Sequence, residues 1–159
     1  MSLEKENFLR TKLITCLQRL DPSTTPLWGK MSVQQMIEHF GGDAVRNANG
    51  RLKIDTILTP SEQLGRMREF MMGDKPFKEN TKNPLMGEEP APLRYKTVQA
   101  AIGALQQELI YFFEAYEKKP DMVIRNPFFG DLNFEQNVQL LYKHALHHLR
   151  QFGVEPPAT

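Results

Sequence analysis

The sequence has 159 residues, enough for one domain with a sizeable core but too few for two comfortable ones. Its 20 basic and 19 acidic side chains give a formal net charge of +1, without the basic excess typical of nucleic-acid-binding proteins. No apolar run has the length of a membrane span, the N-terminal residues do not resemble a secretory signal, and a single cysteine excludes an intramolecular disulfide. We therefore expect one cytoplasmic domain at 1–159, with no nucleic-acid or membrane partner.

The first half of the chain has the periodicity of two helices. At residues 6–20, apolar side chains recur at steps of three and four, which places them on one helical face, and the segment at 21–26 ends the pattern. A second helix is predicted to begin after Ser32, which forms a capping box with Gln35. This helix should end at the stop signal of residues 49–50.

A shorter helix and a long loop are expected next. Thr59 is predicted to cap the helix, Pro60 to occupy its first position, and Gly73 to mark its end. Residues 73–95 contain four prolines and are predicted to form a long irregular loop, whose role the sequence does not indicate. These prolines are Pro76, Pro84, Pro90 and Pro92.

The second half of the chain is predicted to contain two long helices. Residues 97–119 carry a continuous apolar stripe, which Pro120 closes. A loop at 121–132 leads to Asn133, which can cap a last helix that ends at Gly153. Because strand patterning is weak throughout, these elements predict an all-α fold, a bundle of four principal helices and one extra short helix.

Three of the four histidines lie in the last predicted helix, within KHALHHLRQFG at residues 143–153. At about 100° per residue, His148 lies about 60° and His144 about 100° from the centre of the apolar stripe, on the same flank. Because the two are four residues apart, their rings stack one turn above the other and can converge on one ion. His147 points further round toward solvent, and we expect it to be a bystander.

The fourth histidine, His39, lies on the flank of the second predicted helix. Metal sites in bundles are commonly built from facing helices, and three histidines are the ligand set of an open site. Two interpretations of His144 and His148 stay open: ordinary hydrogen-bonded imidazoles, or ligands that share an ion with His39. Asp43 is a candidate to orient His39 or transfer protons, whereas Glu38 points elsewhere and is expected to be solvated.

Two segments of the sequence resemble the paired signatures of the DinB-like superfamily of metal-dependent helical bundles. They are LWGKMSVQQMIEHF at residues 27–40 and NPFFGDLNFEQNVQLLYKHALHHLRQFG at 126–153. The first has Trp-Gly-x-Met before a helix that contains Met-x-x-His. The second has Pro-x-Phe-Gly before a helix with His-x-x-x-His and Arg-Gln-Phe-Gly. The motifs cover a minor part of the chain, and the helix order covers nearly all of it.

The resemblance implies a four-helix bundle with a divalent metal at one end, held by His39, His144 and His148. Zinc or nickel is the expected ion, because imidazole ligands suit both. Related proteins include thiol-dependent transferases and an isomerase that use low-molecular-weight thiols. The expected function is thus a metal-dependent hydrolase or thiol transferase with a small-molecule substrate, a thiol being one class. Such bundles often pair through helices, so a homodimer is also expected.

A second class of function stays open from the sequence. A helical bundle can bind a ligand or a partner without catalysis, with a structural metal or with none. The eight methionines and ten phenylalanines could line an adaptable pocket, although core packing accounts for most of them. The two classes differ at the fourth coordination position, which catalysis requires to be open and a structural site closes with another protein ligand.

Overall fold

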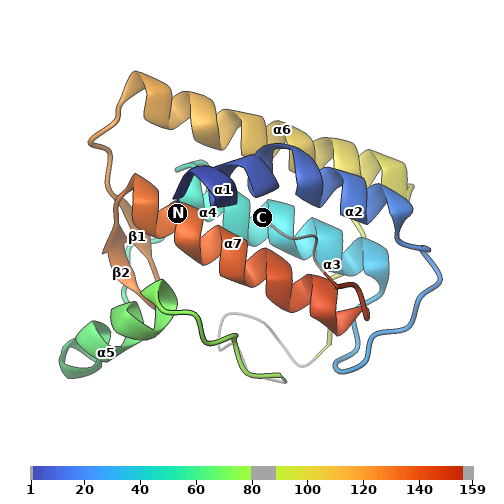
Figure 1. Ribbon diagram of the computed structural model, residues 1–159, viewed down its shortest axis with the longest axis horizontal. Coiled ribbons are helices and arrows are strands. Elements are labelled where there is room, and N and C mark those ends of the chain that lie inside the picture. The colour runs from blue at the N-terminus through green and yellow to red at the C-terminus, as the bar shows by residue number, and fades with distance from the viewer. Residues whose placement is uncertain (1, 80–88, 156–159) are drawn as a thin grey trace.

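The computed structural model describes residues 2–79 and 89–155, which are mostly helical with one short two-stranded sheet (Figure 1). The first helical segment consists of α1 (Ser2–Asn7), the π-helical turn η1 (Phe8–Lys12) and α2 (Leu13–Arg19). The second consists of α3 (Val33–His39), the π-helical turn η2 (Phe40–Val45) and α4 (Arg46–Ala48). Three helices follow, α5 (Ser61–Met72), α6 (Val98–Lys118) and α7 (Phe134–Gln151). The all-α prediction is confirmed at this level.

Side-chain caps fix where three of these helices begin. Before α3, the Ser32 hydroxyl accepts from the Gln35 amide at 3.1 Å, and the Gln35 side chain accepts from the Ser32 amide at 2.9 Å. Asn133 and Gln136 form the same reciprocal pair before α7. Thr97 caps α6 through its hydroxyl. Each cap satisfies backbone donors that the first helical turn leaves without a partner, so the predicted starts hold.

The start of α5 differs from the prediction. The Thr59 hydroxyl does not cap the helix, because it donates to the Phe128 carbonyl at 2.7 Å. Pro60 stands at the N-cap position without a side-chain cap, and the helix begins at Ser61. The competing hydrogen bond joins segments far apart in the sequence, which a local capping pattern cannot reveal.

The segment predicted as a loop at 121–132 contains a hairpin. Strands β1 (Ile124–Asn126) and β2 (Gly130–Leu132) pair antiparallel, with Ile124 opposite Leu132. Gly130 has a φ of 81°, a backbone conformation that favours glycine. Each strand has only three residues, too few to establish the period-2 alternation by which strands are recognised.

The two helical segments, α6 and α7 run side by side and bury one apolar core (Figure 1). Helix α6 packs against α2, α3 and η2, and α1 packs against α7. Phe8, Ile37, Phe112 and Leu141 are among the core residues, and they come from the first helical segment, the second helical segment, α6 and α7 in that order. Helix α5 packs against α7 outside this group, over a second apolar cluster that includes Met71 and Leu140. The apolar stripes read from the sequence therefore face one another.

The predicted loop at 73–95 has no helix or strand in its described parts. Residues 80–88, which include Pro84, lie outside the described residues. The stretch at 89–95 runs beside α3, where it forms contacts that bear on the site below. Among the described residues, no helix combines the length and the apolar character needed to cross a membrane.

Candidate metal centre

Three histidines from two helical segments converge on one point. His39 is the last residue of α3, and His144 and His148 lie one turn apart on α7. One ring nitrogen from each of the three lies within 4.8 Å of the others. The His39 ring centroid is 5.5 Å from that of His144 and 5.3 Å from that of His148. The structure thus brings together the three residues that the sequence analysis selected.

Asp43 orients the ring of His39. Its Oδ2 lies 3.0 Å from His39 Nδ1, and because a carboxylate can only accept, Nδ1 carries the proton. Nε2 of His39 is then the unprotonated nitrogen. The hydrogen bond from His39 holds the pKa of Asp43 below its ordinary value, against the opposing effect of burial. A carboxylate behind a histidine in this way is the usual support of a metal-ligating imidazole.

Gln151 does for His148 what Asp43 does for His39. Its Oε1 lies 2.8 Å from His148 Nδ1, and its Nε2 donates to the Trp28 carbonyl at 3.0 Å. The second bond fixes the amide so that its oxygen accepts from His148, which leaves His148 Nε2 unprotonated. That nitrogen lies 2.8 Å from Nε2 of His144. Two acceptors cannot share such a contact, so His144 Nε2–H donates to His148 Nε2. If this proton moves to His144 Nδ1, the Nε2 atoms of both histidines become unprotonated and lie side by side.

Burial keeps the two histidines of α7 neutral. It lowers the pKa of His148 to about 3, and the charge of His39 adds to the effect. Burial also holds the pKa of His144 well below its ordinary value, helped by the neighbouring charges of His148 and His39. Neutral imidazole is the form that binds metal ions, so at neutral pH these two side chains need not lose an extra proton to act as ligands.

His147 is not exposed to solvent as predicted. The ring is partly buried, with its centroid 5.4 Å from that of Trp28 and 6.1 Å from that of Phe77. It lies outside the three-histidine group. Trp28 precedes α3 and Phe77 follows α5, and both cover a face of α7 that helical periodicity alone assigns to solvent.

Glu38 is buried, not solvated as predicted. Its side chain accepts hydrogen bonds from the backbone amides of Arg94 at 2.6 Å and Tyr95 at 3.3 Å, and from Gln34 Nε2 at 2.9 Å. Only 8% of Glu38 is exposed. Glu38 therefore attaches the segment at 89–95 to α3, one residue before the histidine that ends this helix.

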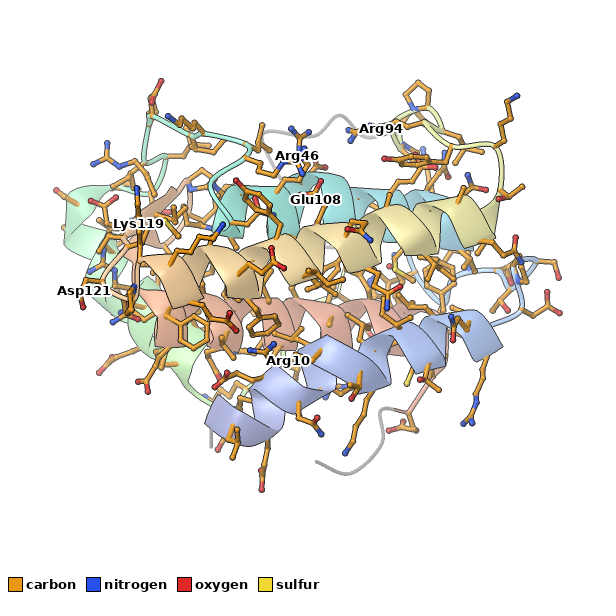
Figure 2. The ribbon with its side chains drawn as sticks, turned by 90° about the horizontal axis from the view of Figure 1, so that it is seen from above. Arg10, Arg46, Arg94, Glu108, Lys119 and Asp121 are labelled. Atoms are coloured by element: carbon orange, nitrogen blue, oxygen red, sulfur yellow. The ribbon has the colours of Figure 1, made fainter. Side chains whose placement is uncertain are left out.

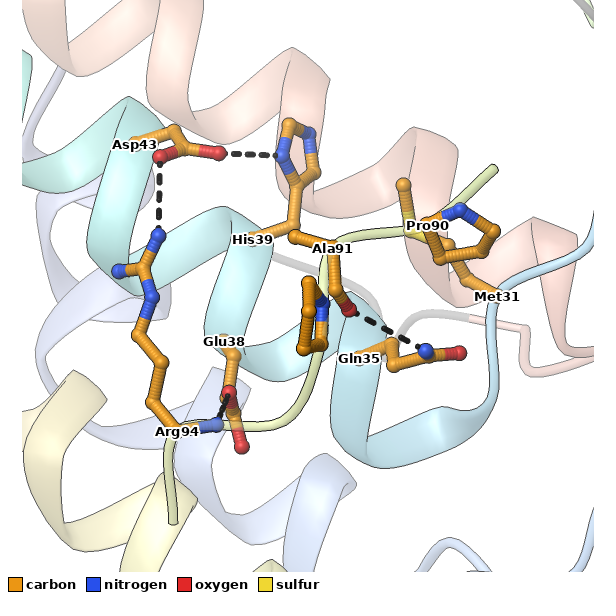
Figure 3. Close-up of a pocket in the computed structure, with 9 residues that line it drawn as sticks. Met31, Gln35, Glu38, His39, Asp43, Pro90, Ala91 and Arg94 are labelled. Atoms are coloured by element: carbon orange, nitrogen blue, oxygen red, sulfur yellow. Dashed lines mark hydrogen bonds and ion pairs between the residues drawn. The ribbon is translucent and has the colours of Figure 1, made fainter. Parts of the chain in front are cut away.

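A small cavity borders the centre between α3 and the segment at 89–95 (Figure 3). His39 and Asp43 line one side, and Pro90 and Ala91 line the other. Its volume of about 20 Å³ suits a single water molecule. Polar hydrogen-bonding groups and a histidine therefore meet at a space that water can occupy, but a larger ligand cannot enter without movement of this segment.

Two residues that support the centre were not predicted in these roles. Gln151 stands three positions after His148 on one helix, a spacing that offered a signal for the contact. Arg94 Nη2 lies 3.8 Å from Asp43 Oδ1. Arg94 comes from the irregular segment at 89–95, and no local pattern indicates that it reaches Asp43 in η2.

Comparisons with known proteins assign no family to the chain. No family model matches it, and neither a curated protein nor a solved structure matches it. The DinB-like resemblance therefore depends on the motif residues, and the functional argument depends on the geometry of the centre.

Proposed function

We propose that this protein is a metal-dependent enzyme with a four-helix bundle of the DinB-like type. In this proposal His39, His144 and His148 bind one divalent cation and leave a coordination position open. The observation that carries it is the convergence of three ring nitrogens within 4.8 Å. Among the described residues, no fourth His, Cys, Asp or Glu joins this group. Three protein ligands with an open position are typical of catalytic sites, and four ligands of structural ones.

The donor set favours zinc or nickel. All three donors are imidazoles, which suit both ions, and no carboxylate belongs to the group. Magnesium and calcium prefer oxygen ligands, so a donor set of three imidazole nitrogens disfavours both ions. The acceptors behind His39 and His148 support this assignment, because they fix the tautomers that aim unprotonated nitrogens at an ion.

A bound cation of this kind supplies Lewis acidity, which serves hydrolysis and the ionisation of a thiol equally well. The residues around it have separable roles in this proposal. Asp43 orients His39 and, being ionised at neutral pH, can accept a proton from a group bound beside that ring. The Phe40 and Phe77 rings pack against His144, with centroids 5.3 and 6.4 Å away, and exclude water from that side. The proposed substrate is a small molecule, with thiols as one class.

A non-catalytic binding or interaction protein, with a structural metal or none, is the second candidate. The volume of the cavity beside His39, about 20 Å³, favours it, because a substrate larger than water does not fit there as the chain stands. The two candidates differ in whether the segment at 89–95 moves to admit a substrate. Titration of the cobalt-substituted protein with a thiol separates them. Binding of the thiol to the ion changes the absorption spectrum if the protein is an enzyme that admits a substrate, and the spectrum stays unchanged if the site is closed.

Metal analysis of protein purified without chelators or a histidine tag tests the proposal. We expect about one zinc or nickel ion per chain in the wild type. The double variant His144→Ala/His148→Ala should lose the ion, whereas His147→Ala, the matched control on the same helix, should retain it. Equal metal content in the wild type and the double variant would contradict the proposal.

The DinB-like type also carries the proposal that two chains form a homodimer through their helices. Light scattering over micromolar concentrations tests it. The mass of a single chain at every concentration would exclude the dimer, without bearing on the metal centre.

A further inference from the structure

A second cavity lies between the α3–η2–α4 segment and α6. Its volume is about 310 Å³, within the lower range of small-molecule sites, about 300–1,000 Å³. It shares Arg94 and Glu38 with the small cavity beside His39. Part of its lining is apolar, including Ala101 and Leu105 of α6. The cavity therefore combines room for a ligand with an apolar wall and charged groups.

Three arginines line this cavity, and their ion pairs are loose. Arg46 Nε is 3.8 Å and Arg51 Nη1 is 3.5 Å from Glu108 Oε2. Arg94 Nη2 is 3.8 Å from Asp43 Oδ1. Charge-assisted hydrogen bonds are about 2.7–2.9 Å long, so these guanidinium groups keep donors that the carboxylates do not engage. Figure 2 shows Arg46 beside Glu108, with Arg94 on the same side of α6.

Arg46 carries the clearest sign of a missing partner. Among the described residues its Nε is the one buried side-chain nitrogen or oxygen without a hydrogen bond. Buried polar groups nearly always have partners, so such an atom requires an explanation. Glu108 does not provide one, because its Oε1 accepts from Asn49 Nδ2 at 3.0 Å and its Oε2 stays 3.8 Å from Arg46 Nε. An anionic oxygen bound beside Arg46 would supply the acceptor.

The carboxylates of the lining do not cancel the arginines. Glu38 accepts from the backbone amides of Arg94 and Tyr95, so its oxygens are already engaged. Glu108 is engaged by Asn49 on one oxygen. The lining thus has three guanidinium groups and two carboxylates, an excess of one positive charge, and the carboxylates direct oxygens to other donors, which leaves arginine N–H groups for a negative ligand.

The backbone at η2 leaves space for this arrangement. A Cβ at Gly42 would overlap with Arg94 Nη1, so glycine allows the guanidinium to lie against the helix. A Cβ at Gly41 would come within 3.3 Å of Leu105. Both glycines line the cavity, and side chains there would displace Arg94 and crowd α6.

We propose that this cavity binds a small organic anion. Its carboxylate or phosphate group pairs with Arg46, Arg51 and Arg94, because the guanidinium fork matches the oxygens of both groups. Its apolar part lies against Ala101 and Leu105. The proposal does not depend on the metal centre, since no cavity residue is one of the three histidines.

Calorimetric titration of the full chain at neutral pH tests the proposal. The probes are butyl phosphate and butyrate, compared with inorganic phosphate and with chloride at equal ionic strength. We expect saturable binding of at least one organic anion, and the two probes distinguish a phosphate from a carboxylate head group. The Gly41 and Gly42 amide signals should shift in nitrogen-15 NMR spectra, while that of Gly65 on α5 stays in place. Inorganic phosphate that binds as tightly as butyl phosphate would overturn the role of the apolar wall.

Charge-removing variants locate the binding. Arg46→Gln should weaken it roughly tenfold to a hundredfold, the usual effect of losing a hydrogen bond to a charged group. Arg66→Gln removes an exposed arginine of α5 and should leave the affinity unchanged. If Arg46→Gln does not fold, Arg51→Gln replaces it, because that side chain is 46% exposed. No binding of either organic anion, or equal affinity in the wild type and the cavity variant, overturns the proposal.

Discussion

Asp43 Oδ2 accepts a hydrogen bond from His39 Nδ1 at 3.0 Å, one helical turn along the same segment. The turn between the two residues is π-helical, since η2 begins directly after His39. Gln151 holds His148 in the same manner, with an uncharged acceptor in place of a charged one. A charged acceptor raises the basicity of the imidazole more than an amide does, so the two supports should contribute unequally to metal affinity.

Replacing Asp43 by Asn tests the contribution of the charged acceptor. The variant retains the size of the side chain but removes the charge, and we expect zinc affinity to fall about 10- to 100-fold, the usual effect of losing such a support. Competition against a chromogenic chelator measures it. Asp55→Asn, at an exposed position, is the matched control and should leave the affinity unchanged. Equal affinities in the two variants would show that the charge of Asp43 does not contribute to zinc binding.

The parts of this fold that the sequence predicts are those whose signals are local. The caps at Ser32 and Asn133 and the apolar stripes of α6 and α7 each depend on residues within a few positions of one another. The positions of His144 and His148 on one flank of α7 follow from the same periodicity. Their approach to His39 depends on how the helices pack, and the family resemblance supplied that expectation.

The wrong predictions concern contacts between distant segments. Glu38 is buried because the amides of Arg94 and Tyr95 reach it from a segment without regular structure. His147 is covered because the rings of Trp28 and Phe77, both far from it in the sequence, pack against its ring. A helical projection places a side chain relative to its own axis, and it carries no information about irregular segments that fold back over that face.

The buried hydrogen bonds of Glu38 should be important for stability. In Glu38→Gln the amide can still accept, but it loses the charge that strengthens both backbone contacts, and its NH₂ group lacks an acceptor in that position. We expect a loss of about 1–3 kcal/mol in the free energy of unfolding, measured by urea denaturation. Glu62→Gln, exposed in the first turn of α5, should change it by less than about 0.5 kcal/mol. Equal stability of the two variants contradicts the proposed anchoring of the segment at 89–95.

The buried histidines of α7 should make the metal-free protein sensitive to acid. Burial lowers the pKa of His148 to about 3, so between about 6.5 and 3 the unfolded chain binds a proton that the native chain refuses. Stability is therefore complete above about pH 6.5 and falls toward pH 3, by up to about 1.4 kcal/mol per pH unit for each such histidine.

Two measurements check this pH dependence in the presence of a chelator. Urea denaturation at pH 7 and pH 5 should show the loss of stability, and His144→Gln/His148→Gln should have a shallower dependence than the wild type. NMR titration of the imidazole protons should find His148 neutral well below its ordinary pKa. A His148 resonance that titrates near pH 6.5 would contradict the burial argument.

Added zinc should raise the melting temperature at neutral pH, because an ion that binds only the native state stabilises it by mass action. At a zinc concentration of 100 times the dissociation constant, the free energy of unfolding increases by about 2.7 kcal/mol. The increment should shrink as pH falls, because an imidazole must be unprotonated at the ligating nitrogen to bind the ion. We expect the core of the fold to form in the absence of the ion, because the apolar stripes of α6 and α7 bury a core to which the three histidines do not belong. His144→Ala/His148→Ala should therefore remain helical by circular dichroism yet show no zinc-dependent increment, whereas His147→Ala should show the full one. If zinc raised the melting temperature of the double variant as much as that of the wild type, the zinc would bind elsewhere, and the proposed metal-dependent enzyme would be rejected.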